Sequence, residues 1–379
     1  MRVWTEYFPT GAVPPTALPA ELDSPSTLVL VFSGLTATEL ADPVAALRGA
    51  FPQAVITGCS TAGEVLGGTV RDGGLEVCVT RFDRTPVTLA GAQIGRSADS
   101  YICGRRLAEQ LAAPSLVGVM VYSDGLNVNG SQLIKGINQG LDERVVVTGG
   151  LAADADRFGR TWVIADDRPT EGIVAAVGLH GDEVVIGHGS CGGYDIFGPQ
   201  RRVTRAKDNV LFELDGQPAL DLYEQYLGEL ASGLPGTGLQ FPLAISDGPH
   251  GDPLVRTMLA VHPGNRSITF AGDIPQGWTA QLMRASFDRL VDGAAQAAET
   301  ATKARTAGEC LAVAISCVGR RMVLKQRVEE ELEAARDGLP SDARLVGFYS
   351  YGEISPLPSG RCDLHNQTMT LTMIGERSA

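Results

Sequence analysis

The sequence of 379 residues lacks an excess of basic residues, long apolar runs and a leader pattern. Its 31 Lys and Arg stand against 44 Asp and Glu, which gives a net charge of −13. Nucleic acid and anionic membrane surfaces are therefore excluded as natural partners, because both need a basic surface. No apolar run approaches the roughly 18 residues of a spanning helix, and MRVWTEYFPT does not have the pattern of a signal peptide. We expect a soluble cytoplasmic protein that binds a small molecule or another protein.

The sequence also lacks the usual motifs of metal, disulfide and nucleotide sites. It has seven cysteines but no C-x-x-C pair, which excludes a zinc site and a disulfide framework and favours a reducing compartment. It has no GxxxxGK[ST] loop, no HExxH and no GxSxG. Glycine-rich runs are present, but none gives GxGxxG in a dinucleotide-binding unit, so nucleotide binding has little support.

A short segment that occurs twice dominates what is present. Residues 56–65 (ITGCSTAGEV) and 345–354 (LVGFYSYGEI) both place Gly-Glu six residues after a first glycine. A strand-like run ending in serine and an amphipathic segment precede each copy. A weaker third copy lies at 117–154, where VGVMVYSDG, a helix and VVVTGGLAAD follow one another. Internal repeats fix the architecture of a chain, so we predict repeated strand–helix–strand units.

The apolar runs are short, rich in Val, Ile and Leu, and bounded by Gly, Pro or Asp, as buried strands are. Helical spacing occurs between some of them, at 40–51, 131–141, 324–339 and, as the longest candidate, 279–301. Strands alternating with helices favour crossover connections and parallel pairing. We therefore predict an α/β fold in which the repeated units form two pseudo-symmetric mixed-sheet halves. The length suits two domains, which we place at 1–220 and 221–379.

Several separated motifs resemble those of the FIST family, in the expected order from about residue 28 to 373. They are GCSTAGE, SDGLNVNG, VVTGGLAAD, VTRAKDNVLFELDGQPALDLYEQYLG, ITFAGDIPQG, SCVGRRMVLKQRVEEE, GFYSYGEISP and LHNQTMTLT. The resemblance implies an N-terminal FIST domain followed by a C-terminal one. It also implies a sensory module for small, amino-acid-like ligands in bacterial signal transduction. Some members resemble haem-containing nitric-oxide sensors that regulate histidine kinases or cyclic-di-GMP enzymes. The sequence shows no kinase or cyclase domain of its own, so we expect the output to pass through a separate protein such as a histidine kinase.

The paired Gly-Glu turns carry Glu64 and Glu353. If the halves are related by a pseudo-two-fold axis, both carboxylates face one central cleft. There they bind a ligand ammonium group, or act as an acid/base pair if one is desolvated. In the alternative, each carboxylate accepts hydrogen bonds within its own glycine-rich turn. The sequence leaves both possibilities open.

The loop at 123–130 (SDGLNVNG) offers polar side chains just before a helix, a place that suits a ligand carboxylate. The alternative is helix capping by Asn129 or Ser131. Four polar residues exceed what one cap requires, so we predict that the loop lines the ligand cleft. The residues assigned to this part of the site are Ser123, Asp124, Asn127, Asn129, Gly149, Gly150 and Asp154.

Further candidates lie at equivalent strand ends. Cys59, beside Ser60, and Cys317, before Arg320, are either reactive thiols or, more commonly for such positions, buried inert ones. Arg320 is suited to pair with a ligand carboxylate or with one of the two glutamates. Tyr349 and Tyr351 stand on either side of Ser350, and we expect one to line the cleft while the other packs in the core.

The cofactor is not determined by the sequence, and haem is one possibility. Haem needs an axial ligand, for which His188 and His365 are the candidates, and without a C-x-x-C-H sequence it would be non-covalent. A hydrogen-bonded structural histidine is the alternative for each. The leading hypothesis is a non-catalytic small-ligand sensor with its ligand in an inter-domain cleft. The alternatives are a haem-based nitric-oxide sensor and an enzyme that uses the glutamates and a cysteine.

Overall fold

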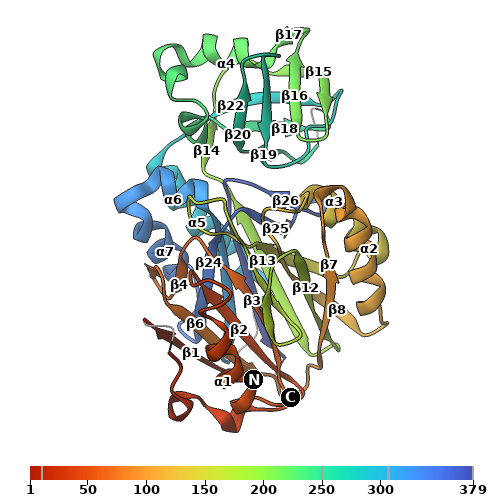
Figure 1. Ribbon diagram of the computed structural model, residues 1–379, viewed down its shortest axis with the longest axis vertical. Helices are drawn as coiled ribbons and strands as arrows, with labels where there is room; N and C mark the ends of the chain where they lie inside the picture. Colours follow the sequence, from red (N-terminus) through yellow and green to blue (C-terminus); the bar gives the residue numbers. More distant parts are fainter. Residues whose placement is uncertain (10–11, 249–250, 305–307, 378–379) are drawn as a thin grey trace.

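The protein consists of two bodies, as seen in the computed structural model (Figure 1). The structure describes residues 1–9, 12–248, 251–304 and 308–377. The larger part, here called the core body, holds three six-stranded sheets and carries both chain termini. The upper body, formed by residues 194–285, holds a nine-stranded sheet and stands above the core body in the view of Figure 1. A chain that leaves the core body and later returns to it produces this arrangement.

Three strand–helix–strand units form the core body. In each unit the two strands pair in parallel, as the crossover helix between them requires. The first contains β2 (Thr27–Ser33), α1 (Ala41–Ala50) and β3 (Val55–Ser60); the second contains β8 (Leu116–Ser123), α3 (Gly130–Gly140) and β9 (Val146–Leu151); the third contains β23 (Cys310–Cys317), α6 (Val318–Leu324), α7 (Val328–Asp337) and β24 (Ala343–Ser350).

Two antiparallel strands extend each parallel pair on one side. They are β6 (Leu75–Arg81) and β1 (Arg2–Phe8) in the first sheet, β12 (Ile173–His180) and β7 (Val87–Gln93) in the second, and β27 (Met369–Glu376) and β13 (Val184–Cys191) in the third. A serine at or next to the end of the first strand of each unit, which is Ser33, Ser123 or Ser316, occupies the same register in its sheet. The three sheets thus repeat one topology.

On the other side, each sheet is completed by a hairpin that belongs to another unit. The hairpin β4 (Glu64–Leu66) and β5 (Thr69–Arg71) follows β3 but pairs with β24; β10 (Val163–Ala165) and β11 (Arg168–Thr170) follow β9 but pair with β3; β25 (Gly352–Pro356) and β26 (Cys362–His365) follow β24 but pair with β9. Each unit therefore gives its hairpin to the next around a ring. The exchange links the beginning and end of the chain and places the twin Gly-Glu turns in two different sheets.

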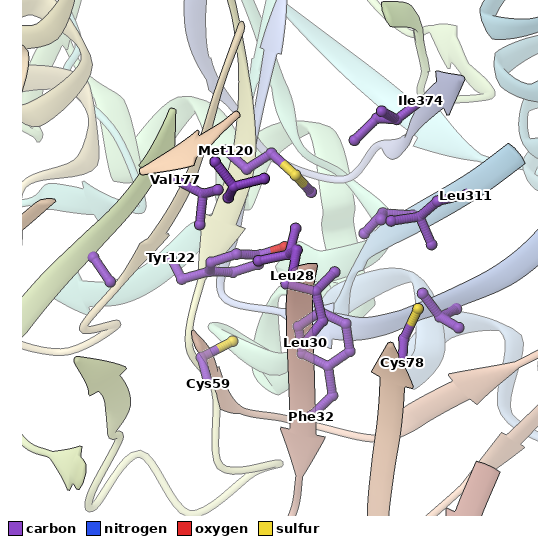
Figure 2. Packing of buried hydrophobic residues seen from close by; sticks show 14 of the residues in the cluster. Leu28, Leu30, Phe32, Cys59, Cys78, Met120, Tyr122, Val177, Leu311 and Ile374 are labelled. Carbon is purple, nitrogen blue, oxygen red and sulfur yellow. The ribbon is translucent and has the colours of Figure 1, made fainter. Parts of the chain in front are cut away.

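The inner faces of the three sheets meet in one apolar core (Figure 2). Each sheet contributes a strand to its centre, with Phe32 from β2, Tyr122 from β8 and Phe348 from β24. The ring centroid of Phe32 lies 4.8 Å from that of Phe348 and 5.8 Å from that of Tyr122. All three side chains are fully buried. Burying a large apolar side chain contributes about 1.5–3 kcal/mol, so contacts between the units stabilise the core body as a whole.

Helices cover the outer faces of the sheets. α2 (Ser100–Leu111) and α3 lie together on the second sheet, while α5 (Phe287–Ala301) and α7 lie on the third (Figure 1). The prediction of one helix over 279–301 was wrong in its first third, because Thr279–Ala285 forms strand β22. Alternate residues there, Ala280 and Leu282, are buried in the upper body, and the helix begins only after Ser286. The helix expected at 324–339 is interrupted at Lys325, whose φ is 53°.

The upper body combines one helix with short strands. The helix is α4 (Ala219–Leu227), and the strands are β14 (Tyr194–Ile196), β15 (Arg201–Lys207), β16 (Val210–Leu214), β17 (Gln217–Pro218), β18 (Leu243–Ser246), β19 (Leu254–Arg256), β20 (Met258–His262), β21 (Ser267–Phe270) and β22. The chain enters through β14 and leaves through β22, and these two strands pair with each other. We call this two-stranded connection the neck.

Short 3-10 turns lie between the larger elements. They are η1 (Pro15–Ala17), η2 (Ala20–Leu22), η3 (Ser97–Asp99), η4 (Gly228–Gly233), η5 (Gly236–Gln240), η6 (Thr302–Ala304) and η7 (Lys325–Arg327). In the part of the chain that the structure describes, no helix combines the length and the apolar character needed to cross a membrane.

The predicted α/β class is confirmed, with mixed sheets and repeated strand–helix–strand units in both halves of the chain. The weaker copy at 117–154 is a full member of the repeat, equal in topology to the other two. The division of the sequence into 1–220 and 221–379 stays a prediction.

Candidate functional site

A cavity of about 950 Å³ lies between the two bodies. This volume is within the range of small-molecule sites, and clefts between domains are common places for them. We call this cavity the cleft. The core body contributes Ser97, Ala98, Tyr101, Gly125, Leu126, Val128, Asn129, Gln132, Leu151, Phe158, Cys317, Val318, Gly319, Met322 and Tyr351; the upper body contributes Asp208, Asn209, Pro235, Gly236, Leu239, Thr257, Met258, Leu259, Ala271 and Gly272.

The loop after β8 forms one side of the cleft. Asn129 caps α3, with its side-chain oxygen accepting from the backbone amide of Gln132 at 3.1 Å. The Asp124 carboxylate is buried and accepts from the backbone amides of Leu126, Asn127 and Gly172. Asp124 therefore holds the shape of the loop from behind. Of the four polar residues predicted here, Asn129 lines the cleft, whereas Ser123, Asp124 and Asn127 do not.

Two stacked aromatic rings form another side. The rings of Phe158 and Tyr351 lie 4.7 Å apart and within 10° of parallel. Tyr351 donates its hydroxyl to the Asp154 carboxylate and to the carbonyl of Ala155, at 3.0 Å from the latter. Asp154 also accepts from the backbone amides that follow Phe158. Asp154 does not line the cleft, but its hydrogen bonds hold Tyr351 and the segment after Phe158 in place. We call the two stacked rings of Phe158 and Tyr351 the aromatic wall.

Polar contacts join the two bodies beside the cleft. The Asp273 carboxylate, on the upper body, accepts from the side-chain amides of Asn129 at 2.7 Å and Gln132 at 2.6 Å. The backbone amide of Asp273 donates to the Ser131 hydroxyl, and Arg256 donates to the Asp273 carbonyl. We call the set of Asp273, Asn129, Gln132 and Ser131 the latch. Gln132 also lines a second cavity, of about 730 Å³, on the far side of the latch.

The structure places Glu64 and Glu353 away from the cleft. Both side chains are buried, and each accepts a hydrogen bond from a hydroxyl in its own turn, from Thr61 to Glu64 at 2.5 Å and from Ser350 to Glu353 at 2.8 Å. Glu353 also accepts from the amide and hydroxyl of Thr368. These are the bonds of carboxylates that brace their own turns. Contact of either glutamate with a ligand stays a prediction.

Burial makes these two carboxyl groups weak acids. Desolvation raises the pKa of Glu64 to about 7 and that of Glu353 to about 8, against hydrogen bonds that lower both. Beside Glu64, the buried Glu76 also has its pKa raised, by desolvation first and by the charge of Glu64 second. A carboxyl group whose pKa lies higher in the folded chain than in the unfolded chain stabilises the fold only while it is protonated.

We predict that Glu353 makes the free energy of unfolding fall as pH rises from about 5 to 8. In this range the unfolded chain has lost the proton that folded Glu353 retains, so each such group costs about 1.4 kcal/mol per pH unit. Replacing Glu353 by Gln should remove its share of the slope, as measured by urea unfolding across pH. The exposed Glu330→Gln is the matched control and should keep the wild-type slope. An unchanged slope in Glu353→Gln would contradict the raised pKa.

The two cysteines differ in their surroundings. Cys59 is fully buried in the apolar core, and burial raises the pKa of its thiol. Cys317 lines the cleft at the start of α6, yet only 3% of it is exposed and burial raises its pKa as well. A thiolate is the reactive form, so both thiols are protonated and unreactive in this structure. Their role in ligand binding stays a prediction.

Arg320 lies in a buried ion pair. Its guanidinium is fully buried, contacts Glu331 at 2.7 Å and donates to the carbonyls of Gly192 and Leu290. Glu331 also accepts from the hydroxyl of Tyr349 at 2.7 Å. Arg320 is therefore paired with Glu331 in the core, and neither Glu64 nor Glu353 is its ion-pair partner. Tyr349 is buried in this network, whereas Tyr351 lies just past the end of β24 and lines the cleft.

The remaining predicted site residues have structural contacts. Ser60 accepts from the backbone amide of Trp162 at 3.1 Å and is buried. Gly149 and Gly150 lie in β9 where it pairs with β25, and a side chain at Gly149 would meet the backbone of Val121. None of the three lines the cleft.

The predicted haem ligands lie outside both cavities. His365 is buried with its Nε2 atom 2.9 Å from the carbonyl oxygen of Ser355. His188 lies on β13 in the core body, and burial lowers its pKa. Within the described ranges, no histidine lines either cavity, and no three His, Cys, Asp or Glu side chains are grouped to hold a metal. The cleft does not fit haem held by either histidine, and ligation by them stays a prediction.

Sequence reasoning missed the upper-body half of the cleft. Asp208 and Asn209 lie in the VTRAKDNV motif, and Gly272 and Asp273 lie in the ITFAGDIPQG motif. These motifs were recognised but not assigned to a site, because nothing local in them indicates that the hairpin tips face a distant loop. Phe158, Leu259 and Met322 were also missed. Their signal is structural, since they are large apolar side chains left 51%, 46% and 42% exposed at one cavity.

Comparison with known proteins agrees with the motifs. The family model described as the FIST N domain matches residues 27–217, and the one described as the FIST C domain matches residues 219–356. No curated protein matches the sequence. Among solved structures, the chain is similar to a cyanuric acid hydrolase from A. caulinodans, with 8% identity over 99% of both chains and a TM-score of 0.39. A likeness of that size indicates neither activity nor ligand.

Proposed function

The chain belongs to the FIST family, and from that premise we propose that it senses a small ligand bound in the cleft between its two bodies. FIST domains are small-ligand sensor domains of signal transduction. The observation that carries the proposal is the cleft itself, with its volume of about 950 Å³ and its lining drawn from both bodies. Exposed apolar side chains gathered at one place mark binding sites, and Phe158, Leu259 and Met322 gather here.

The way in which the bodies are joined supports a signalling role. The neck and the latch connect them, Arg256 of the upper body also donates to the carbonyl of Leu364 in the core body, and a ligand in the cleft contacts both bodies. A ligand that binds one relative position of the bodies better than another shifts the equilibrium between them. We propose that this shift is the signal, and that a separate cytoplasmic protein, such as a histidine kinase, receives it.

The other two hypotheses gain no comparable support. The haem-sensor hypothesis named His188 and His365 as axial ligands, and neither of them lines the cleft. The enzyme hypothesis needs a nucleophile or an acid/base pair at a site. Neither Glu64 nor Glu353 lines the cleft, and burial raises the pKa of Cys317, the cysteine that does line it.

Filling the cleft tests the proposal. Replacing Leu259 by Trp adds bulk inside the cleft at a side chain that is 46% exposed, so the fold should tolerate it. We expect the variant to lose the rise in melting temperature that the small-molecule fraction of a cell extract gives to the wild-type protein. Leu230→Trp is the matched control, because Leu230 is 53% exposed and lies outside the cleft. A rise that persists in Leu259→Trp would place the ligand elsewhere.

A further inference from the structure

The lining of the cleft carries charge of only one sign. Among its lining residues, all within the described part of the chain, Asp208 is the single carboxylate and there is no Lys, Arg or His. The chain as a whole has a net charge of −13. A buried anion needs a paired cation or several donors to offset its desolvation. The negative charge of the whole chain and the lack of cationic side chains in the lining therefore both disfavour an anionic ligand, including one that is charged only through its own carboxylate.

The aromatic wall presents flat apolar surface. Phe158 and Tyr351 are stacked and line the cleft together, and Tyr351 is held in place by its bond to Asp154. Stacked or edge-to-face contact between aromatic rings adds attraction beyond simple burial. Leu126, Met258 and Met322 supply further apolar lining. A flat ring fits this surface better than a flexible polar chain does.

On the upper body, one buried hydroxyl is left without a hydrogen bond. Thr257 lies between β19 and β20, is 5% exposed and lines the cleft. Its backbone carbonyl accepts from Ala271, but within the described structure its Oγ1 atom has no partner. Buried hydroxyls are nearly always hydrogen-bonded. The Oγ1 atom is itself covered in this structure, so it bonds to a ligand's polar group when the Thr257 side chain turns toward the cleft.

We propose that the cleft takes an uncharged or cationic molecule with a planar ring and an amide-like polar end, and that it rejects the corresponding carboxylate. The ring packs against the wall of Phe158 and Tyr351, and the polar end bonds to the Thr257 hydroxyl. A cationic end also gains from Asp208. Such a ligand spans from the core body to the upper body. This inference rests on the proposed function and narrows the chemical class of its ligand.

Three planar probes of almost equal shape test, on the full-length protein, whether the cleft accepts neutral and cationic ligands and rejects anionic ones. They are benzamide, benzamidine and benzoate, which are neutral, cationic and anionic at pH 7. We expect benzamide and benzamidine at millimolar concentration to raise the melting temperature, and benzoate to leave it unchanged. Cyclohexanecarboxamide, which lacks the flat ring, should bind more weakly than benzamide by isothermal titration.

Two variants locate the contacts. Thr257→Val keeps the shape and removes the hydroxyl, and it should weaken benzamide about three- to tenfold. Asp208→Asn should weaken benzamidine about two- to fivefold and leave benzamide unchanged. If the Thr257→Val protein proves unstable, Thr257→Ser provides the second measurement, because it keeps the hydroxyl and should retain benzamide binding.

The binding of the three probes decides whether the proposed ligand class is right. Binding of benzoate as tight as that of benzamide, or no binding by any probe, would overturn it, as would benzamide binding that Leu259→Trp leaves intact. The proposed function fails separately. If benzoate binds and Leu259→Trp abolishes its binding, the cleft is a ligand site but the chemical class is wrong. If the cell extract's effect survives in Leu259→Trp, the site itself is wrong.

Discussion

Replacing Gly347 by alanine is expected to destabilise the protein by more than about 4 kcal/mol, enough to prevent accumulation of folded chain. Gly347 has a φ of 155°, and a Cβ atom there would lie 1.8 Å from the carbonyl oxygen of Ala314 on the paired strand. That oxygen belongs to the backbone of a central strand and cannot move aside. Folded yield and urea unfolding measure the effect.

The repeat extends this prediction to two more positions. Gly58 and Gly149 have φ of 148° and 141°, and a Cβ atom would meet the carbonyl oxygens of Val31 and Val121 at 1.8 and 2.0 Å. All three alanine variants should therefore fail alike. Gly49→Ala in α1 is the matched control, since no atom lies within 4 Å of a Cβ there, and its helical position should make it neutral or stabilising. A stable Gly347→Ala protein would contradict the equivalence of the three units.

Replacing Arg320 by methionine is expected to cost about 3–5 kcal/mol in the free energy of unfolding. The change leaves the carboxylate of Glu331 buried without its cation and leaves the carbonyls of Gly192 and Leu290 without a donor. The network joins α6 to α5, to α7 and to the segment that follows β13, so its loss loosens the third sheet and its covering helices together. Chemical unfolding of the purified variant measures the loss.

The double variant Arg320→Met, Glu331→Leu is the control. It removes both charges, and it should recover part of the lost stability because no unpaired charge remains buried. The same two variants test whether Arg320 stabilises the core, as the structure indicates, or contacts a ligand, as the sequence suggested. If Arg320→Met keeps wild-type stability but loses the extract-induced rise in melting temperature, the assignment of Arg320 to the core network is wrong.

Sequence patterns predicted which segments of the core body form strands and helices, but they did not predict which strands pair with one another. Apolar runs and helical spacing located β2, β8, β23, α1 and α3, because each buries a face set by its own residues. The exchange of hairpins around the ring was not predictable. A hairpin such as β4–β5 carries no local signal that it pairs with β24, some 280 residues later in the chain, rather than with the strand that precedes it.

The same limit applies to the site. The loop at 123–130 was predicted at the cleft because polar residues follow a buried strand, and Asn129 does line it. Asp124 has the same composition signal, but its oxygens bond to the backbone of its own loop. Nothing in the sequence around Thr257 distinguishes it from other threonines between two strands. Its significance comes from the unsatisfied hydroxyl in a cavity, which only the packing of the two bodies creates.

Hydrogen exchange of the full-length protein, with and without the small-molecule fraction of a cell extract, tests the central claim most directly. The claim predicts slower exchange on both sides of the cleft at once, in the loop at 125–132 of the core body and at 257–273 of the upper body, because a ligand there contacts both. The Leu259→Trp protein should show neither change. Protection confined to one body, or protection around Glu64 and Glu353 with none at the cleft, would contradict the account.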